Sequence, residues 1–261
     1  MDFILIDNTR EGARVARDLG ITRFMLDFEV KGKAERQSMK SSRISDHRYG
    51  DLIGIKAILN TSQLIVRIDP ERDLEEQLER CIEANVDELM VPMIEDIASL
   101  ERLISLAPPN INFVPLIETK FSLVHLDEII ARLKPNYLHF GLNDLHLQYN
   151  LSFMFSMFNE PQFIESLHVA REHKIRFGIG GVAPLSSKLE LSSVEILMLL
   201  KNYGASGVIL SRAFNQFLTN KIEEFRNEYI KITSIVSKYE NTILDVSRIL
   251  EKIQRIELGH A

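Results

Sequence analysis

Residues 112–133 have the sequence NFVPLIETKFSLVHLDEIIARL, a pattern that recurs along the whole chain. The run Asn112–Leu116 is short and apolar and lacks the polar alternation of a half-exposed strand, so it predicts a strand buried on both faces. Thr119 then precedes Ser122–Leu133, where apolar residues recur at spacings of three and four. This predicts an amphipathic helix with a polar N-terminal cap. The stretch therefore predicts a strand followed by the helix that covers it.

Seven further apolar runs resemble Asn112–Leu116 in length and character. They are Phe3–Ile6, Phe24–Phe28, Leu64–Ile68, Glu88–Val91, Tyr137–Phe140, Ile175–Gly178 and Gly207–Leu210. Helical patterns lie between several of them, at Thr9–Leu19, Asp73–Ala84, Ile94–Ser105 and Pro161–His173. Alternating strands and helices are typical of a parallel sheet, and eight such units are the number in a TIM barrel. We therefore predict an α/β fold, a (β/α)8 barrel.

A doubly wound open sheet is the alternative fold. Such sheets usually have about five or six strands and a glycine-rich turn after the first one. Here the first strand is followed by Asp7-Asn8-Thr9, with no G-x-G-x-x-G pattern. The barrel is therefore favoured, and the open sheet is kept as the alternative.

The composition is that of an ordinary globular protein. The 261 residues are 45% apolar and 26% charged, with a net charge of −6, which excludes intrinsic disorder. The 31 basic residues form no dense run and are outnumbered by 37 acidic ones, so nothing indicates a nucleic-acid surface. No stretch approaches the roughly 18 apolar residues of a membrane span, and the first residues lack the basic region of a signal peptide. With the single cysteine Cys81, we expect a cytoplasmic protein that binds neither nucleic acid nor membranes.

The C-terminal residues follow a different period. Apolar residues recur every seven positions in two columns, which are Ile222, Tyr229, Val236, Ile243 and Leu250, and Phe225, Ile232, Tyr239, Val246 and Ile253. This predicts one helix of about 37 residues, whereas a barrel helix needs only about 12. We divide the chain into a barrel, residues 1–215, and a long C-terminal helical extension, residues 216–261. We expect its apolar seam to form a homo-oligomer, by association or by helix exchange, with packing on the chain's own barrel as the alternative.

Polar residues and glycines follow the predicted strands and are expected to share one mouth, since active sites of TIM barrels lie at the C-terminal ends of the strands. They are Asp27 and Glu29 at the end of the second strand, Arg67 at the end of the third, Glu118 after the fifth, Gly141, Asn143 and Asp144 after the sixth, Gly180 and Gly181 after the seventh, and Arg212 after the eighth. Glu118 and Asp144 suit Mg²⁺ or Mn²⁺, which take oxygen ligands and keep positions open for a chelating substrate. Roles as helix caps or in ion pairs are the alternative for these two acids.

Four of the other residues suggest contacts with an anionic substrate. Arg67 is placed to bind a carboxylate or an enolate oxygen in bidentate fashion. Gly180 and Gly181 let backbone amides approach a ligand. Arg212 could pair with an anionic group of that ligand or with a carboxylate at the mouth. A tight turn without a ligand is an equal interpretation of the glycines.

Two insertions follow strands, where active-site loops of a barrel lie. Residues 30–50 are polar and contain His47. Residues 145–159 are unusually apolar, which favours core or a subunit contact over a lid. His139 lies within the predicted sixth strand, where a buried histidine with satisfied hydrogen bonds is the ordinary interpretation.

Five segments resemble, in order, the signature strands of the HpcH/HpaI aldolase/citrate lyase family. They are Phe24–Glu29, Val66–Pro70, Val91–Asp96, Pro115–Thr119 and Phe140–Leu145, and the resemblance covers about residues 1–215. Its most specific part is Ile117-Glu118-Thr119 followed by Asn143-Asp144-Leu145. The resemblance implies that Glu118 and Asp144 bind Mg²⁺ or Mn²⁺ and that Arg67 binds the pyruvoyl or enolate oxygen. It also implies that backbone amides near Gly141 and Asn143 bind the substrate carboxylate.

The chain departs from the family pattern at the catalytic base. Pyruvate aldolases of the family have a catalytic histidine after the second strand, for which His47 is the nearest candidate here. The citrate lyase-like branch has three acids in that region. Asp27 and Glu29 match the first two, but Val30 stands at the third position. Asp27, Glu29 and His47 are therefore the candidate catalytic residues beside Arg67, and a surface position is the alternative for His47.

The resemblance implies a carbon–carbon lyase, a metal-dependent aldolase of class II that acts on a 2-oxo acid such as pyruvate. Two other interpretations are kept. One is an enzyme like the citrate lyase β subunit, which acts on an acyl-CoA thioester. The other is a catalytically degenerate barrel that serves as a binding or assembly module.

Overall fold

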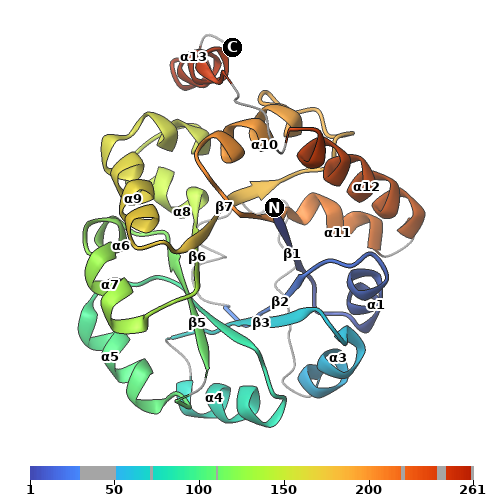
Figure 1. Ribbon diagram of the computed structural model, residues 1–261, viewed down its shortest axis with the longest axis vertical. Coiled ribbons are helices and arrows are strands. Elements are labelled where there is room, and N and C mark those ends of the chain that lie inside the picture. The colour runs from blue at the N-terminus through green and yellow to red at the C-terminus, as the bar shows by residue number, and fades with distance from the viewer. Residues whose placement is uncertain (30–50, 71–72, 110, 219–220, 240–244, 260–261) are drawn as a thin grey trace.

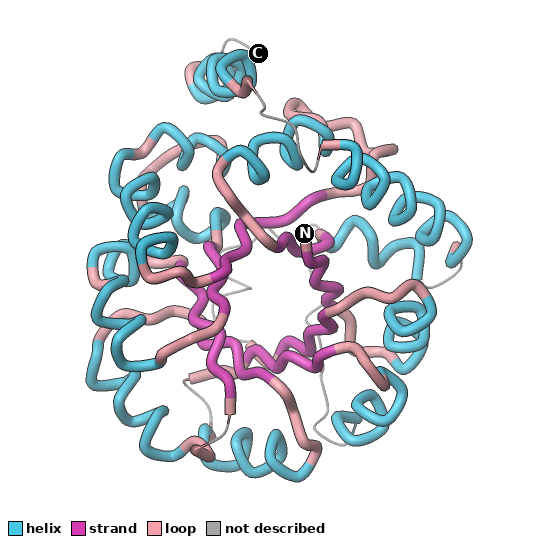
Figure 2. Tube along the Cα trace, in the orientation of Figure 1, coloured by secondary structure: helices cyan, strands magenta, loops and turns pink. Residues whose placement is uncertain are grey.

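The computed structural model describes the chain except for residues 30–50, 71–72, 110, 219–220, 240–244 and 260–261. Eight parallel strands form a closed barrel in sequence order, and Figure 2 shows them as an inner ring inside a ring of helices. The strands are β1 (Asp2–Ile6), β2 (Arg23–Asp27), β3 (Gln63–Arg67), β4 (Glu88–Val91), β5 (Asn112–Ile117), β6 (Tyr137–Phe140), β7 (Arg176–Val182) and β8 (Gly207–Leu210). The predicted TIM barrel is confirmed. The open sheet is wrong, because β1 pairs with β8.

The outer ring consists of helices that follow the strands (Figure 1). They are α1 (Arg10–Asp18), α3 (Leu52–Leu59), α4 (Leu74–Glu83), α5 (Ile97–Leu106), α6 (Lys120–Val124), α7 (Leu126–Leu133), α8 (Leu142–Gln148), α9 (Pro161–Glu172), α10 (Ser193–Asn202) and α11 (Arg212–Leu218), with a 3-10 helix, η2 (Met154–Asn159). Thr119 caps α6 as expected, since its side chain accepts a hydrogen bond from the Ser122 amide. The predicted helix Ser122–Leu133 is nevertheless divided, because the backbone of His125 leaves the helical conformation between α6 and α7.

The apolar residues form one cluster between the barrel and the helices and a smaller one inside the barrel. The inner cluster is Ile4, Met25, Ile65, Met90, Val114, Leu116 and Tyr137. Because strand residues alternate in direction, the same face of β2 also carries Arg23 before Met25 and Asp27 after it. The barrel interior is therefore apolar in its middle and charged toward both ends.

The C-terminal extension is helical, but the single long helix is wrong. It consists of α12 (Ile222–Lys238) and α13 (Ser247–Glu257). In α12 the seam packs on the chain's own barrel: Tyr229 contacts Phe3 and Phe225 contacts Phe214, each with ring centroids 5.4 Å apart. In α13 the seam residue Ile253 is also buried and belongs to the same apolar cluster as the barrel. Homo-oligomer formation stays a prediction.

The second C-terminal helix, α13, lies outside the ring of helices in Figure 1 and is anchored by its own polar contacts. The Glu257 carboxylate accepts hydrogen bonds from the Ser152 amide (2.8 Å), the Phe153 amide (3.0 Å) and the Ser156 hydroxyl (2.6 Å). Lys252 pairs with Glu195 of α10 at 2.9 Å. The helix thus holds the connection after α8.

That connection belongs to the core. Phe155, Met157 and Phe158 are buried, which confirms the core interpretation of residues 145–159 over a lid. None of the described helices is long and apolar enough to cross a membrane.

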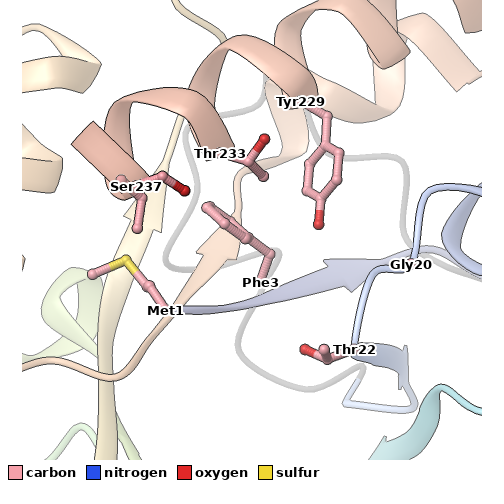
Figure 3. Close-up of a pocket in the computed structure, with 8 residues that line it drawn as sticks. Met1, Phe3, Gly20, Thr22, Tyr229, Thr233 and Ser237 are labelled. Carbon is pink, nitrogen blue, oxygen red and sulfur yellow. The ribbon is translucent and has the colours of Figure 1, made fainter. Parts of the chain in front are cut away.

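A pocket of about 210 Å³ lies where α12 crosses the start of β1 (Figure 3). Its lining is Met1, Phe3, Gly20, Thr22, Tyr229, Thr233, Val236 and Ser237. Met1 and Phe3 lie at the N-terminal end of the barrel, and Gly20 and Thr22 precede β2. The pocket is therefore at the end opposite to the predicted mouth.

Replacement of Phe225 by alanine tests the packing of α12. Phe225 is fully buried against the barrel, so we expect Phe225→Ala to lower the free energy of unfolding by about 3–5 kcal/mol. Ile230 of the same helix is 55% exposed, and Ile230→Ala should change it by less than about 0.5 kcal/mol. Urea unfolding at two protein concentrations measures both. A loss for Phe225→Ala that shrinks as the concentration rises would instead place the seam between subunits.

Candidate active site

Arg67 and two carboxylates form a buried ion-pair network at the C-terminal ends of β2 and β3. Asp27 and Arg67 are register partners at the ends of these strands. The Arg67 Nε and Nη2 donate to the two oxygens of Asp27 at 2.9 and 2.7 Å, and Nη1 lies 3.1 Å from Glu29 Oε2. Burial alone would lower the pKa of Arg67, but the charges of Asp27 and Glu29 outweigh it and raise that pKa above its usual range. Arg67 is therefore a permanent cation in a fixed orientation.

The network leaves part of the guanidinium for a ligand. An arginine has five N–H groups, and Arg67 uses three of them in its contacts with Asp27 and Glu29 within the described chain. The Nε/Nη2 edge is engaged by Asp27, so the remaining donors are one N–H on each terminal nitrogen. These two form the end of the guanidinium that can bind a substrate oxygen.

Glu118 lies directly after β5 and is buried, with 2% of its surface exposed. Its Oε1 accepts a hydrogen bond from the Met93 amide at 3.0 Å. Burial raises the pKa of Glu118 to about 8, since the opposing attraction of Arg67 is offset by repulsion from Asp144 and Glu29. This carboxyl group is therefore largely protonated at pH 7, and its negative charge needs a further cation.

Met93 aims its amide at Glu118 through an unusual backbone. Its φ is +47°, in the left-handed region that side chains other than glycine rarely adopt. Such strained residues cluster at functional sites. Nothing in the sequence around Met93 indicated this conformation, because Met93 is not a residue type that favours a positive φ.

Gly141 packs directly against Glu118 at the start of the helix that carries Asp144. A Cβ at Gly141 would lie 2.7 Å from the Glu118 Cβ, so a larger residue would push the two strands apart. The helix α8 begins directly after this glycine and carries Asp144 in its first turn. Asp144 is near enough to raise the pKa of Glu118 by charge repulsion. The structure thus brings both acids to the same end of the barrel, after β5 and after β6.

The remaining predicted site residues lie around the same mouth. Asn143 is exposed on α8, and Arg212 is exposed at the start of α11. Gly180 and Gly181 belong to β7, which extends to Val182 instead of ending at Gly178. His47 falls outside the described residues. His146 places its Nδ1 3.2 Å from the Leu142 carbonyl oxygen, within its own helix.

Asp7 is a further acid at this end of the barrel that sequence reasoning did not select. It follows β1 and accepts hydrogen bonds from the amide and hydroxyl of Thr9. Burial raises the pKa of Asp7, although these hydrogen bonds oppose the shift. Its position directly after a predicted strand was the available signal.

Comparison with known proteins shows likeness in fold alone. No protein-family model matches the chain, and no curated protein matches it in sequence. A HpcH/HpaI aldolase/citrate lyase family protein from Burkholderia cenocepacia J2315 aligns with a TM-score of 0.64 and 13% identity, over 85% of this chain and 93% of its own. RipC from Yersinia pestis aligns with a TM-score of 0.53 and 16% identity, over 88% and 94% of the two chains.

A third solved structure, a HpcH/HpaI aldolase from Desulfitobacterium hafniense DCB-2, aligns with a TM-score of 0.55 and 14% identity, over 85% of this chain and 91% of its own. Each alignment spans most of both chains, so the likeness includes the complete barrel. The family resemblance of the strand motifs is therefore confirmed at the level of fold: this chain is similar in its barrel to HpcH/HpaI aldolase/citrate lyase family structures.

Proposed function

We propose that the chain is a carbon–carbon lyase of the aldolase type, which acts on a small 2-oxo acid and uses a divalent metal ion held by Glu118 and Asp144. The observation that carries the proposal is the convergence of these acids with Arg67 at one end of the barrel. The fold shared with solved HpcH/HpaI aldolases supports the same reaction class.

The two acids fit Mg²⁺ or Mn²⁺ by their chemistry. Both offer oxygen donors, and the raised pKa of Glu118 reflects burial first and repulsion from Asp144 and Glu29 after it, so a cation beside this carboxylate would favour its charged form. Among the described residues no group of three or more His, Cys, Asp or Glu could hold a metal. Mg²⁺ usually takes only one or two protein carboxylates and completes its shell with water and substrate oxygens. When bound, such an ion supplies positive charge that polarises the 2-oxo group.

Arg67 supplies the second positive charge. Breaking or forming the bond beside the 2-oxo group develops negative charge on the enolate oxygen, and donors already oriented toward that oxygen stabilise it most. The two remaining N–H groups of Arg67 perform this role, since Asp27 and Glu29 hold the guanidinium in place. In the cleavage direction, Asp27, Glu29 or His47 accepts the proton of the hydroxyl group whose carbon leaves as an aldehyde, and the electron pair of the broken carbon–carbon bond passes to the enolate.

Backbone and outer groups complete the proposed substrate site. The amides near Gly141 and Asn143 bind the substrate carboxylate, and Gly180, Gly181 and Arg212 line the side of the mouth formed by β7 and β8. The described residues offer no observation that favours an acyl-CoA thioester over a free 2-oxo acid, so the free acid is the proposed substrate.

Replacement of either acid tests the metal site. We expect Glu118→Gln and Asp144→Asn to weaken Mn²⁺ binding by about 100-fold or more while the protein stays folded, because each change removes a ligand charge at the mouth. Glu95 is an exposed acid after β4, and Glu95→Gln should leave the affinity unchanged. Calorimetric titration with Mn²⁺ measures all three, and normal affinity in both site variants would remove the metal from the proposal.

Replacement of Arg67 by lysine tests substrate binding separately. An ammonium group cannot reproduce the planar pair of N–H donors. In the presence of Mn²⁺, we expect Arg67→Lys to weaken binding of oxalate, an enolate mimic, by about 10-fold or more, which is about 1.4 kcal/mol. Mn²⁺ affinity should change far less. Equal loss of both affinities would assign Arg67 a structural role.

The pKa of Glu118 predicts a pH dependence with a definite sign. At pH 7 the carboxyl group, with a pKa of about 8, is mostly protonated, so Mn²⁺ must displace its proton. We expect release of about one proton at pH 7, and affinity that rises about tenfold per pH unit up to pH 8 and then levels off. Titration calorimetry at pH 7 in two buffers of different ionisation enthalpy measures the released proton. Binding without proton release would contradict the protonated state.

A further inference from the structure

A polar pair, Tyr137 and His139, lies inside the barrel on β6. Both side chains are 1% exposed. Gly178 on the neighbouring strand β7 leaves the space they occupy, since a Cβ there would lie 2.1 Å from the Tyr137 hydroxyl oxygen and 2.4 Å from His139 Nδ1. The barrel interior is thus shaped around these two polar side chains, and neither takes part in the proposed mechanism.

The hydrogen bonds of His139 determine which ring nitrogen carries the proton. His139 Nε2 lies 3.0 Å from the carbonyl oxygen of Gly180, and a carbonyl can only accept. Nε2 therefore carries the hydrogen, and Nδ1 accepts from the Tyr137 hydroxyl at 3.3 Å. Burial lowers the pKa of His139 to about 4, so the ring stays neutral near pH 7. His139 is a fixed donor to one backbone carbonyl.

That carbonyl belongs to a β-bulge. Gly178 pairs with Gly207 and Gly181 pairs with Ile209, so three residue steps on β7 lie opposite two on β8. One extra residue in a strand is the definition of a bulge, and bulges often lie beside active sites. Gly180 has a φ of +51°, in the left-handed region that glycine adopts readily. The donor His139 therefore meets the strand where it departs from regular pairing.

The bulge contacts the helix that carries Asp144. A Cβ on Gly180 would lie 3.0 Å from Leu142 Cδ1. Leu142 is buried and is the first residue of α8, two positions before Asp144. The position of the bulge and the position of this helix are thus linked by direct packing.

We propose that His139 is a positioning residue: by donating a hydrogen bond to the Gly180 carbonyl it holds the β7 bulge, and the bulge seats Leu142 and with it Asp144. The effect on metal binding rests on the proposed function. The effect on the bulge and on α8 does not.

Nuclear magnetic resonance of the metal-free protein tests the structural part. We expect the histidine ¹⁵N spectrum to show His139 with its hydrogen on Nε2. In His139→Leu, which removes the donor, the backbone amide signals of Gly180, Leu142 and Asp144 should move. Hydrogen on Nδ1 in the wild type, or an unmoved Asp144 amide in the variant, would overturn the proposal.

Mn²⁺ binding tests the consequence for the site. We expect His139→Leu to weaken Mn²⁺ binding about 10-fold, and His139→Gln, whose amide can donate to Gly180, to restore most of the affinity. Gly180→Ala should weaken Mn²⁺ binding as much as His139→Leu does, because the new Cβ strains the backbone at a positive φ and crowds Leu142. The two changes together should weaken binding no more than either alone, because both act through one bulge.

Gly20→Ala is the matched control. Gly20 also has a positive φ, +66°, but a Cβ there meets open space. This variant carries a similar backbone strain far from the mouth, and its Mn²⁺ affinity should equal that of the wild type. If Gly20→Ala and Gly180→Ala weaken binding equally, the effect is one of general stability and the proposal fails.

The two parts can fail independently. A wild-type protein that binds no Mn²⁺ would refute the proposed metal function. The positioning role would then be decided by the Asp144 amide signal alone, and Gly180→Ala supplies that measurement if His139→Leu does not fold.

Discussion

The pairing of β1 with β8 joins the two ends of the strand series through four register partners, from Asp2 with Gly207 to Leu5 with Leu210. This closure makes all eight strands parallel neighbours, so residues at their C-terminal ends face one another across a single opening. Asp27, Arg67, Glu118 and Gly141 are distant in sequence, and the barrel brings them to one mouth. The closed interior also excludes water from side chains that point inward. Interactions between charges at this end are therefore screened less than at the protein surface.

Charge at the mouth is unbalanced in one direction. Arg67 is the cation among Asp27, Glu29, Glu118 and Asp144 in this network. Burial raises the pKa of Glu118 to about 8, because the attraction of Arg67 is opposed by repulsion from Asp144 and Glu29, so Glu118 holds a proton at neutral pH. Either a proton or a divalent cation can neutralise this excess of negative charge, so the two compete for the same carboxylate. This excess of negative charge is the physical basis of the proposed metal site.

In the N-terminal half of the barrel interior, buried polar side chains contact one another. Arg23 lies 3.9 Å over the ring of Tyr137 and 3.3 Å from Glu88, and Tyr137 in turn hydrogen-bonds to His139. These groups contact one another within the barrel, but Arg23 Nη1 and Glu88 Oε2 are buried without a hydrogen-bond partner among the described residues. The barrel therefore holds buried polar groups at both ends, and the proposed binding site uses only those at the C-terminal ends of the strands.

Local patterns in the sequence were sufficient for the strands and for most helices of the barrel, because buried runs and amphipathic periods reflect burial that each segment needs wherever it lies. The strand-end acids and Arg67 were also predictable, since parallel strands place such residues at a common edge. The C-terminal heptads were misread as one helix, because a seven-residue period specifies an apolar stripe but not the surface that covers it. The strained amide of Met93, the bulge at Gly180 and the raised pKa of Glu118 were decided by tertiary structure alone. Each depends on distances between segments far apart in the chain, and only the closed barrel sets those distances.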